Sequence, residues 1–475
     1  MRNGYLKRED RKTILWLGDD VRAPSGIGTM TKELMEGMCH RYNFIQIGAA
    51  VSHAHGLDPV DLSDELSEFT GVKDAVLKVY PYNGYGDPEI VRKLINEYQP
   101  DGLVHFTDPR YWVWLYQMEH ELRTQGIPIM FYTIWDDLPY PMYNSLYYRS
   151  SDWFGCISKQ TYNIVKQVRE KSGHPLEDWQ LKYVPHGINP DKFFPIDFND
   201  EQQAKDFLDL RKGLYTEEIM DDIEFCVLYN SRNIRRKMTS DICYAFAKFV
   251  ADLPEEKRNN CRLVLHTDPI DENGTDLPTF IDQVIPEIQP LVIFSKDKID
   301  FQTLNCLYNA ADVLVNVSSN EGFGLTVAES LMAGTPVIVN VTGGLQDQIG
   351  QTDDEGNLLT ENDFTYEWGS NHDGRYRNHG EWSFPVWPAT RSLVGSPPTP
   401  YIFDDRIDVS DVADRLREVY DLGRVERKRR GLSGREFCLG EGGLNSENMC
   451  NLFMEGIQNT LENFEEPELW SVWKV

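Results

Sequence analysis

The chain has 475 residues, of which 47 are Lys or Arg and 76 are Asp or Glu, so its formal net charge is −29. Hydrophobic residues make up 41% of the chain, which is too apolar for a disordered protein, and the length predicts two domains with separate cores. The excess of acids argues against a general nucleic-acid-binding protein, because contacts with a phosphate backbone need a basic face.

Features of a signal peptide or a membrane span are missing from the sequence. Residues 1–12 are charged, and the apolar run 14–18 is far shorter than the roughly 20 residues that a spanning helix needs. The eight cysteines occur singly, without a C-x-x-C pair, which disfavours zinc sites and disulfide frameworks. We therefore expect a cytoplasmic protein without a transmembrane segment, whose thiols are buried and reduced.

Short β-rich runs alternate with helical patterns in two successive series, and such alternation predicts parallel sheets with helical crossovers. The runs of the first series are 13–18, 44–48, 102–106 and 128–133. Those of the second series are 225–229, 262–266, 291–294, 313–317 and 336–340. We therefore predict an α/β protein with two Rossmann-like, doubly wound domains, whose ligand sites lie at the carboxyl ends of the strands and face each other across a cleft.

The boundary between the two domains is expected near residue 190. Residues 183–195 are rich in Pro and Gly, and the acidic stretch 197–224 follows them, which is typical of a turn and a solvated linker. We assign residues 1–190 to an N-terminal domain and residues 191–440 to a C-terminal domain.

Three segments of the C-terminal part need separate interpretation. Residues 351–405 interrupt the pattern with many Gly, Pro, Asn, Asp and aromatic residues, and we predict an insertion there. It is either an acceptor or partner surface or a decoration held by its own aromatic side chains. Residues 411–430 are expected to form one helix and residues 448–464 another. We expect the tail of about 441–475 to return to the N-terminal domain.

Gly26 and Gly28 lie in a loop between the first strand and a helix that is expected to begin near Thr29. Small residues there let backbone amides approach an anion at the positive end of the helix. Thr31 stands where a dinucleotide fingerprint has its third glycine, so a nicotinamide site is disfavoured. The loop is a candidate anion site, and the alternative is a plain tight turn.

Arg232 and Lys237 directly follow the first strand of the second series. Cations at the carboxyl end of a strand suit a diphosphate, since Arg binds two oxygens at once and Lys acts as a point charge. The alternative is a solvated run of charges.

Residues 320–336 are the most informative segment. Glu321 lies in a loop with glycines at 322 and 324, and Glu329 lies in the helix that follows. The glycines free backbone amides at the start of that helix, which fits an anion. A carboxylate held in such a loop accepts hydrogen bonds from vicinal hydroxyls, so this segment predicts a sugar site.

These residues resemble glycosyltransferase family 4, the retaining enzymes of the GT-B fold in the group 1 glycosyltransferases. Glu321 and Glu329 resemble the family's E-x7-E pair. Arg232 and Lys237 resemble its Arg and Lys five positions apart, and residues 342–344 resemble its glycine turn. The resemblance covers most of the chain.

The resemblance implies that residues 1–190 are the acceptor-side domain and residues 191–440 the domain that binds the nucleotide sugar, and it implies roles for these residues. Arg232 and Lys237 would neutralise the donor diphosphate, Glu321 would contact the donor sugar and Glu329 would hold the ribose. Further donor-binding positions would be loop glycines and backbone amides: Gly26, Gly28, Phe323, Gly324 and Leu325. Retention in the family relies on the leaving diphosphate to help deprotonate the acceptor, so stabilising that diphosphate is the protein's main contribution. No cofactor or metal is expected, and the chain has no Asp-x-Asp pair.

The N-terminal domain departs from the family's pattern in two places. The family's His-x-His is His105-Phe-Thr107 here, and its Thr-x-His-Asp has Trp135 in place of the histidine. The candidates for polar contacts on the acceptor side are His105, Asp108, Asp136 and Asp137. The alternative for His105 is a structural histidine at the end of a strand.

We therefore expect a retaining, metal-independent glycosyltransferase that moves a hexose or pentose from a UDP-sugar to a hydroxyl of a glycan or a small molecule. One alternative is glycosylation of a hydroxymethylated DNA base, as some viral GT-B enzymes perform. Its support is the basic run 424–430 together with Arg375, Arg377 and Arg391, which could equally be solvated surface. Another alternative is an inactive module that binds sugar nucleotides or glycans.

Overall fold

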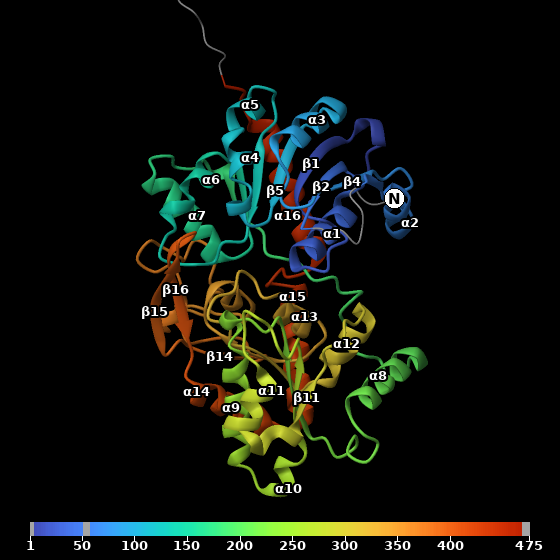
Figure 1. Ribbon diagram of the computed structural model, residues 1–475, viewed down its shortest axis with the longest axis vertical. Coiled ribbons are helices and arrows are strands. Elements are labelled where there is room, and N and C mark those ends of the chain that lie inside the picture. The colour runs from blue at the N-terminus through green and yellow to red at the C-terminus, as the bar shows by residue number, and fades with distance from the viewer. Residues whose placement is uncertain (1–3, 51–57, 468–475) are drawn as a thin grey trace, which may run out of the picture. The chain divides into compact units, whose positions relative to one another are not determined.

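The computed structural model describes residues 4–50 and 58–467 and divides the chain into two compact units. The first unit comprises the chain up to Gly187, residues Ser396–Pro400 and the chain from Ser446 onward. The second unit comprises Ile188–Gly395 and Tyr401–Asn445. Residues 468–475 of the tail that was expected to return lie outside the described residues. Each unit is built around its own sheet (Figure 1).

The sheet of the first unit has eight strands in the order β3-β4-β2-β1-β5-β6-β7-β8, parallel except for the pair β3 and β4. The strands are β1 (Lys12–Asp19), β2 (Tyr42–Ala49), β3 (Val60–Asp61), β4 (Leu77–Pro81), β5 (Gly102–Phe106), β6 (Ile129–Thr133), β7 (Trp153–Cys156) and β8 (Leu181–Tyr183). Every residue of β2 and of β5 is buried, as in a parallel sheet covered on both faces. The chain runs from β1 to one side and returns to β5 on the other, so the topological switch point lies between β1 and β5.

Helices from both ends of the chain cover this sheet: α1 (Gly26–Met38), α2 (Ser63–Thr70), α3 (Pro88–Tyr98), α4 (Val113–Gln117), α5 (Glu119–Arg123), α6 (Ser145–Arg149), α7 (Lys159–Lys171) and α16 (Ser446–Asn463). The C-terminal helix α16 packs among the first elements of the chain (Figure 1). Its Phe453 stacks on Trp16 of β1 with ring centroids 5.6 Å apart. A side chain at Gly456 would overlap the ring of Trp153, so this glycine permits the close approach of α16.

The sheet of the second unit has six parallel strands in the order β11-β10-β9-β12-β13-β14. They are β9 (Phe225–Asn230), β10 (Cys261–His266), β11 (Val292–Phe294), β12 (Val313–Asn316), β13 (Val337–Asn340) and β14 (Ser383–Val386). Here the switch point lies between β9 and β12, which pair side by side with Val313 opposite Val227. The loops that follow these two strands are therefore neighbours at the carboxyl edge of the sheet.

The helices of the second unit are α8 (Glu201–Leu214), α9 (Thr239–Ala251), α10 (Glu255–Arg258), α11 (Leu277–Val284), α12 (Phe301–Ala310), α13 (Leu325–Met332), α14 (Val409–Asp421) and α15 (Gly423–Leu439). The acidic stretch that we expected to be a solvated linker contains α8, which buries only Phe207 and packs on α12. The single helix predicted over residues 411–430 is two helices. The chain breaks at Gly423, whose φ of +73° lies in the left-handed region and ends the first helix.

The segment 351–405 differs from the predicted insertion in one respect. It contributes β14 to the edge of the main sheet, and only then forms the two-stranded sheet of β15 (Thr390–Ser396) and β16 (Thr399–Arg406). The sequence pattern hid β14 because the strand is short and contains Pro385. An edge strand tolerates proline, since one side of it has no neighbour to receive an N–H donor.

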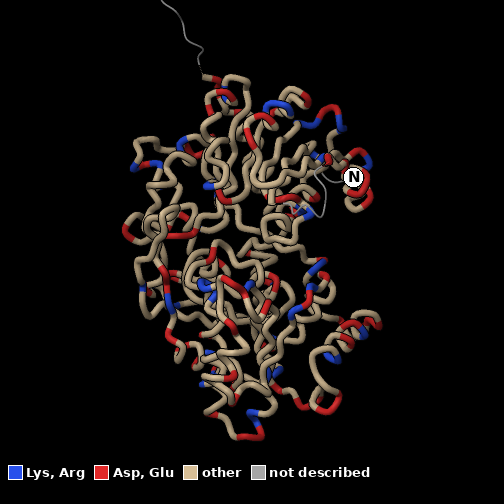
Figure 2. Tube along the Cα trace, in the orientation of Figure 1, with Lys and Arg blue, Asp and Glu red and all other residues tan. Residues whose placement is uncertain are grey.

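Further expectations concerned the cysteines and membrane-spanning helices. All eight cysteines are buried and none forms a disulfide. No helix among the described residues is both long enough and apolar enough to cross a membrane. Acidic residues occur throughout both units (Figure 2).

Candidate functional site

The loops after β9 and β12 are joined by an ion pair at the switch point of the second unit. The ammonium of Lys237, which follows β9, donates a hydrogen bond to Oε2 of Glu321, which follows β12. Nη1 of Arg236 lies 3.5 Å from the same oxygen and donates to the backbone oxygen of Asn320 at 2.7 Å. The side chains of Lys237 and Glu321 are both buried. The structure thus brings together two residues that lie 84 positions apart in the sequence.

A sharp turn of the backbone directs Lys237 into this site. Residues Arg235–Lys237 form one turn of 3-10 helix, and Met238 follows in the left-handed region with a φ of +56°. A residue with a Cβ in that region costs about 1 kcal/mol or more, so the surrounding contacts must hold it there. One such contact is the amide of Ser319, which donates to the backbone oxygen of Arg236 at 2.8 Å and ties the two loops together.

The charge of Glu321 is maintained by its neighbours. Burial acts to raise the pKa of this carboxyl, but the charges of Lys237 and Arg236 outweigh burial and the pKa is lowered. Glu321 is therefore an anion at neutral pH and accepts hydrogen bonds. A buried carboxylate of this kind, at the start of α13, is suited to hold hydroxyl groups.

Two glycines after β13 clamp the backbone of the Glu321 loop. The amide of Gly344 donates to the backbone oxygen of Glu321 at 2.9 Å. A Cβ added to Gly343 would lie 2.1 Å from that oxygen, and one added to Gly344 would lie 2.3 Å from the oxygen of Gly322. Only glycine permits such close contact between two stretches of backbone. These are the glycines of the turn that the sequence singled out, and their function in the structure is to fix the loop.

Replacing Gly343 with Ala is expected to lower the free energy of unfolding by about 2–4 kcal/mol, because the new methyl group overlaps backbone and not a flexible side chain. Gly356→Ala is the matched control. Gly356 also has a positive φ, of +88°, but a Cβ there meets nothing within 4 Å, so the cost should be only about 1 kcal/mol. Urea unfolding of both variants measures the difference, and equal losses would contradict the clamp.

Glu329 lies on α13 and is buried beside an aromatic hydroxyl. Oη of Tyr308 donates to its Oε2 at 2.5 Å, and Nδ2 of Asn230 donates to the same Tyr308 oxygen at 2.8 Å. Burial raises the pKa of Glu329 to about 7, although the hydrogen bond from Tyr308 opposes this shift. The carboxyl therefore titrates near neutral pH, unlike that of Glu321. Tyr308 and Asn230 were not among the predicted site residues.

Arg232 is not part of this cluster. Its side chain is 62% exposed, and its Nε donates to Oδ2 of Asp271 at 2.7 Å. The cation that contacts Glu321 beside Lys237 is Arg236, which we did not predict. In the sequence Arg236 stands among three adjacent cations, and nothing in their order shows which of them turns inward.

The first unit places Gly26 and Gly28 at its own switch point, at the start of α1. Oγ of Ser25 caps this helix by accepting from the Gly28 amide at 3.0 Å, and it donates to Oδ2 of Asp19 at 2.7 Å. A Cβ on Gly28 would lie 2.5 Å from the backbone oxygen of Ala23, so the tight loop requires this glycine. Burial raises the pKa of Asp19. The Gly28 amide is thus engaged within the loop, next to a carboxyl group.

His105 lies within the aromatic core of the first unit. Its Nδ1 is 2.7 Å from Oη of Tyr116, and its ring stacks on Phe131 with centroids 5.2 Å apart. It has no exposed surface, and burial lowers its pKa to about 3. A residue enclosed in this way does not reach a substrate, so the structural alternative for this histidine fits the structure better than an acceptor-side contact.

Burial of His105 predicts a loss of stability in acid. Below pH 6.5 the unfolded state binds a proton that the folded state does not bind until about pH 3, so the contribution of His105 to stability falls by about 1.4 kcal/mol per pH unit as the pH decreases through this range. His105→Gln should remove this contribution, whereas His120→Gln, at an exposed position, should leave the slope unchanged. Urea unfolding between pH 4 and 7 measures the slopes. An unchanged slope in His105→Gln would show that the imidazole is already charged.

The predicted acidic residues of the first unit lie closer to the surface. Asp108 follows β5 and forms an ion pair with Arg110, whose Nε lies 2.9 Å from Oδ1. The Arg110 guanidinium lies over the ring of Trp135, 5.3 Å from its centroid. Asp136 and Asp137, which follow Trp135, are half-buried. These acids therefore stand in partly open positions after β5 and β6, where polar contacts with a ligand are sterically allowed.

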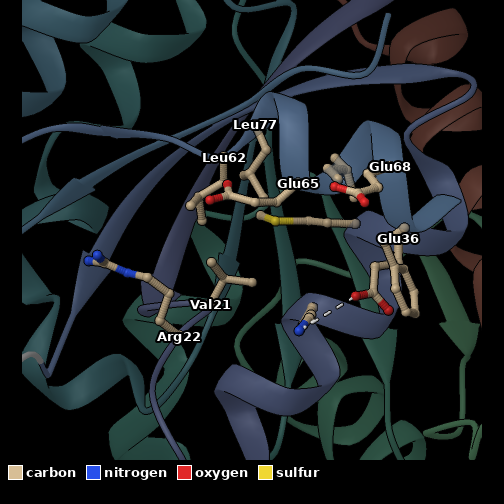
Figure 3. A pocket seen from close by; sticks show the side chains of 11 residues that line it. Val21, Arg22, Glu36, Leu62, Glu65, Glu68 and Leu77 are labelled. Carbon is tan, nitrogen blue, oxygen red and sulfur yellow. Dashed lines mark ion pairs between the residues drawn. The ribbon is translucent and has the colours of Figure 1, made fainter. Parts of the chain in front are cut away.

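A cavity of about 650 Å³ lies in the first unit between α1 and α2 (Figure 3). Its floor is apolar, with Met35, Leu66 and Leu77 among its residues. The polar side chains around it include three glutamates against one lysine and one arginine: Glu36, Glu65, Glu68, Lys32 and Arg22. An excess of acids does not suit a diphosphate, so this cavity is not the donor site that the sequence predicts.

Comparisons with known proteins show what the segment around this site and the fold are similar to. Residues 236–365 match the family "Glycosyl transferases group 1". The matched segment contains Arg236, Lys237, Glu321, Glu329 and the glycine turn, and it begins after Arg232. The resemblance to group 1 glycosyltransferases that we inferred from these motifs is thereby confirmed for this segment.

Two curated relatives are similar to this chain over segments of nearly equal length. The chain is 27% identical over 177 residues to alpha-monoglucosyldiacylglycerol synthase of Acholeplasma laidlawii, covering 37% of this chain and 39% of the relative. It is 25% identical over 181 residues to mannosylfructose-phosphate synthase of Agrobacterium fabrum, covering 36% of each. The matches therefore span less than half of the length of these curated relatives.

Solved structures extend the similarity of fold to nearly the whole chain. Anabaena Alr3699/HepE in complex with UDP and glucose has a TM-score of 0.61 at 12% identity, covering 94% of this chain and 100% of the other. Sucrose-phosphate synthase from Thermosynechococcus elongatus has a TM-score of 0.62 at 17% identity, covering 95% and 99%. These neighbours confirm the GT-B fold, with two Rossmann-like domains.

Proposed function

We propose that the protein is a retaining glycosyltransferase that moves a sugar from a UDP-linked donor to a hydroxyl acceptor. The observation that carries this proposal is the buried ion pair of Lys237 and Glu321 at the switch point of the second unit. Ligands of doubly wound sheets bind at such points, and this one lies inside the segment that matches the glycosyltransferases. The cation of the pair suits the diphosphate of a nucleotide sugar, and the carboxylate suits the hydroxyls of its sugar.

In this proposal the cations hold the donor diphosphate. Lys237 and Arg236 lie at the carboxyl end of β9, and Arg232 stands at the exposed margin of the same loop, where its pair with Asp271 is open to exchange with phosphate. As the bond to the sugar breaks, negative charge accumulates on the leaving diphosphate. A preorganised donor to such a charge contributes about 3–4 kcal/mol to catalysis. Fixed cations and backbone amides would perform this function without a metal or another cofactor.

The carboxylates hold the rest of the donor. Glu321 would accept hydrogen bonds from hydroxyls of the sugar, and the backbone amides of Phe323, Gly324 and Leu325 would lie beside it at the start of α13. Glu329 would accept from the ribose hydroxyls. That the donor is UDP-linked is supported by the complexes of Anabaena Alr3699/HepE with UDP and with UDP-glucose.

The acceptor would bind at the first unit, as a glycan or a small molecule. Asp108, Asp136 and Asp137 are the acidic residues that could orient an acceptor hydroxyl, and the Gly26 and Gly28 loop would lie near the phosphates. His105 is left out of this set because it is enclosed in the core.

The DNA-base alternative has no specific observation in its favour. Arg375 lies over the ring of Trp368 and Arg377 over that of Trp387, with centroids 4.4 and 4.1 Å away, and Arg391 forms an ion pair with Asp405. Arg391 is occupied within the second unit, and Arg375 and Arg377, although exposed, each lie against an aromatic ring of the segment 351–405.

Donor binding tests the proposal. A ligand at 100 times its Kd adds about 2.7 kcal/mol of stability, so UDP-glucose should raise the Tm of the protein clearly, while Lys237→Met should reduce this rise. ADP-glucose and GDP-mannose compare the bases. No stabilisation by any nucleotide sugar would overturn the assignment of the donor site, and stabilisation without any turnover would favour the inactive binding module.

A further inference from the structure

Helix α15 carries five cations between residues 424 and 430, and three of them are neutralised. Nε of Arg427 pairs with Asp312 at 2.9 Å. Arg429 pairs with Glu381 and Glu426, and Arg430 pairs with Glu426. Arg424 and Lys428 form no ion pair with any of the residues that the structure describes. They are four positions apart, so they lie on the same face of the helix.

Both cations line a cavity of about 520 Å³ within the second unit. Its other walls come from α8 and from the ends of α12 and α13. The neutral polar groups of these walls already have partners: Oγ1 of Thr335 donates to the oxygen of Tyr308 at 2.8 Å, and Nδ2 of Asn309 donates to that of Phe194 at 2.9 Å. Asp312, Arg427 and Arg429 also line the cavity, but Arg427 pairs with Asp312, and Arg429 pairs with Glu381 and Glu426, so Arg424 and Lys428 are the polar groups that remain for a ligand.

Large apolar side chains surround the same cavity without being covered. Phe198 is 64% exposed and Val425 is 86% exposed, and Leu432 is also exposed. Phe198 rests edge-on against Phe207 of α8, with ring centroids 5.2 Å apart. Uncovered apolar groups around a concave site are typical of a place where a ligand binds.

This cavity is separate from the candidate donor site. Its residues Asp312 and Pro336 stand just before β12 and β13, at the amino ends of these strands. Glu321 and Lys237 follow the carboxyl ends of β12 and β9. The two places therefore lie at opposite edges of one sheet, and a ligand in the cavity would not contact the ion pair.

We propose that this cavity binds a small amphipathic anion, which is a phosphate or carboxylate joined to an apolar body. Arg424 and Lys428 would neutralise the anion, while Phe198, Val425 and Leu432 would cover the apolar body. An inorganic anion leaves the apolar side chains uncovered. A neutral ligand leaves Lys428 without a counterion and Arg424 with only the nearby carboxylate of Asp312, which Arg427 already pairs. The volume lies within the range of about 300–1,000 Å³ that is usual for small-molecule sites.

Phenyl phosphate is the probe for this site, titrated into the full chain by calorimetry at low salt. We expect it to bind at least tenfold more tightly than inorganic phosphate or benzyl alcohol. Arg424→Gln combined with Lys428→Gln should weaken its binding at least tenfold, and Val425→Ser should weaken it about threefold. Because these side chains make no ion pairs, the Tm should stay unchanged.

Arg430→Gln is the matched control, since Arg430 lies on the same helix but is paired with Glu426 and does not line the cavity. It should bind phenyl phosphate like the parent. The proposal is overturned if the double variant binds within twofold of the parent, or if inorganic phosphate binds as tightly as phenyl phosphate. Sedimentation with phosphatidylglycerol vesicles that depends on Arg424 and Lys428, without binding of phenyl phosphate, would overturn it in favour of a membrane surface.

Discussion

Replacing Lys237 with Met is expected to reduce kcat/KM for sugar transfer by about 100- to 1,000-fold and to lower the free energy of unfolding by about 3 kcal/mol. The variant removes a fixed cation from the place where the leaving diphosphate would develop charge. It also leaves the buried Glu321 carboxylate with Arg236 as its neighbouring cation, at 3.5 Å. Donor turnover and urea unfolding measure the two effects separately.

Two further variants distinguish the electrostatic explanation from general damage. Lys237→Met combined with Glu321→Gln removes both buried charges, so it should regain most of the lost stability but none of the activity. Lys257→Met breaks the ion pair with Glu224, in which both side chains are well exposed, and should cost less than about 1 kcal/mol. A double variant that is less stable than Lys237→Met alone would contradict the electrostatic explanation.

Glu329→Gln is expected to remove a dependence of stability on pH. The pKa of this carboxyl is raised to about 7 in the folded state, against an ordinary value of 4.5. Between these values the folded state holds a proton that the unfolded state has lost, so the contribution of Glu329 to the stability of the parent falls as the pH rises from 4.5 to 7. The glutamine carries no such cost, and its advantage over the parent should grow by about 2–3 kcal/mol between pH 5 and pH 8.

Urea unfolding at pH 5 and pH 8 measures this change, with Glu218→Gln on the surface as the control that should show none. Donor binding supplies a second measurement. Ribose hydroxyls would donate to the ionised carboxylate, so the affinity of the parent for UDP-glucose should increase from pH 6 to pH 8, and that of Glu329→Gln should not. A difference in stability between Glu329→Gln and the parent that is the same at pH 5 and pH 8 would show that Glu329 is not buried as described.

The sequence predicted best those features that follow from local patterns of residues. The spacing of Glu321 and Glu329 and the glycine turn at 343–344 are local patterns, and the parallel sheet follows from the alternation of strands and helices. Each of these requires only short-range information. The sequence therefore predicted the GT-B fold and the segment of the second unit that matches the glycosyltransferases.

Other features depend on contacts that a sequence pattern does not contain. Arg236 and Lys237 are the cations that point towards Glu321 because Met238 adopts a left-handed backbone conformation. No residue type near Met238 predicts that conformation. Tyr308 reaches Glu329 from α12, which is distant in sequence. From the sequence His105 could be either an acceptor-side contact or a structural histidine at the end of a strand, and the aromatic side chains that enclose it come from other elements. In each case tertiary packing decides what the side chain can touch.

The most direct test of the central claim is the release of UDP from UDP-glucose, followed by NMR so that the anomeric configuration of the product is seen. Retaining transfer through the site at β9 and β12 predicts that the parent releases UDP and forms an α-linked product from the α-linked donor. Glu321→Gln and Lys237→Met should slow both by about 100-fold or more. A β-linked product would contradict retention, and turnover unaffected by either substitution would contradict the site.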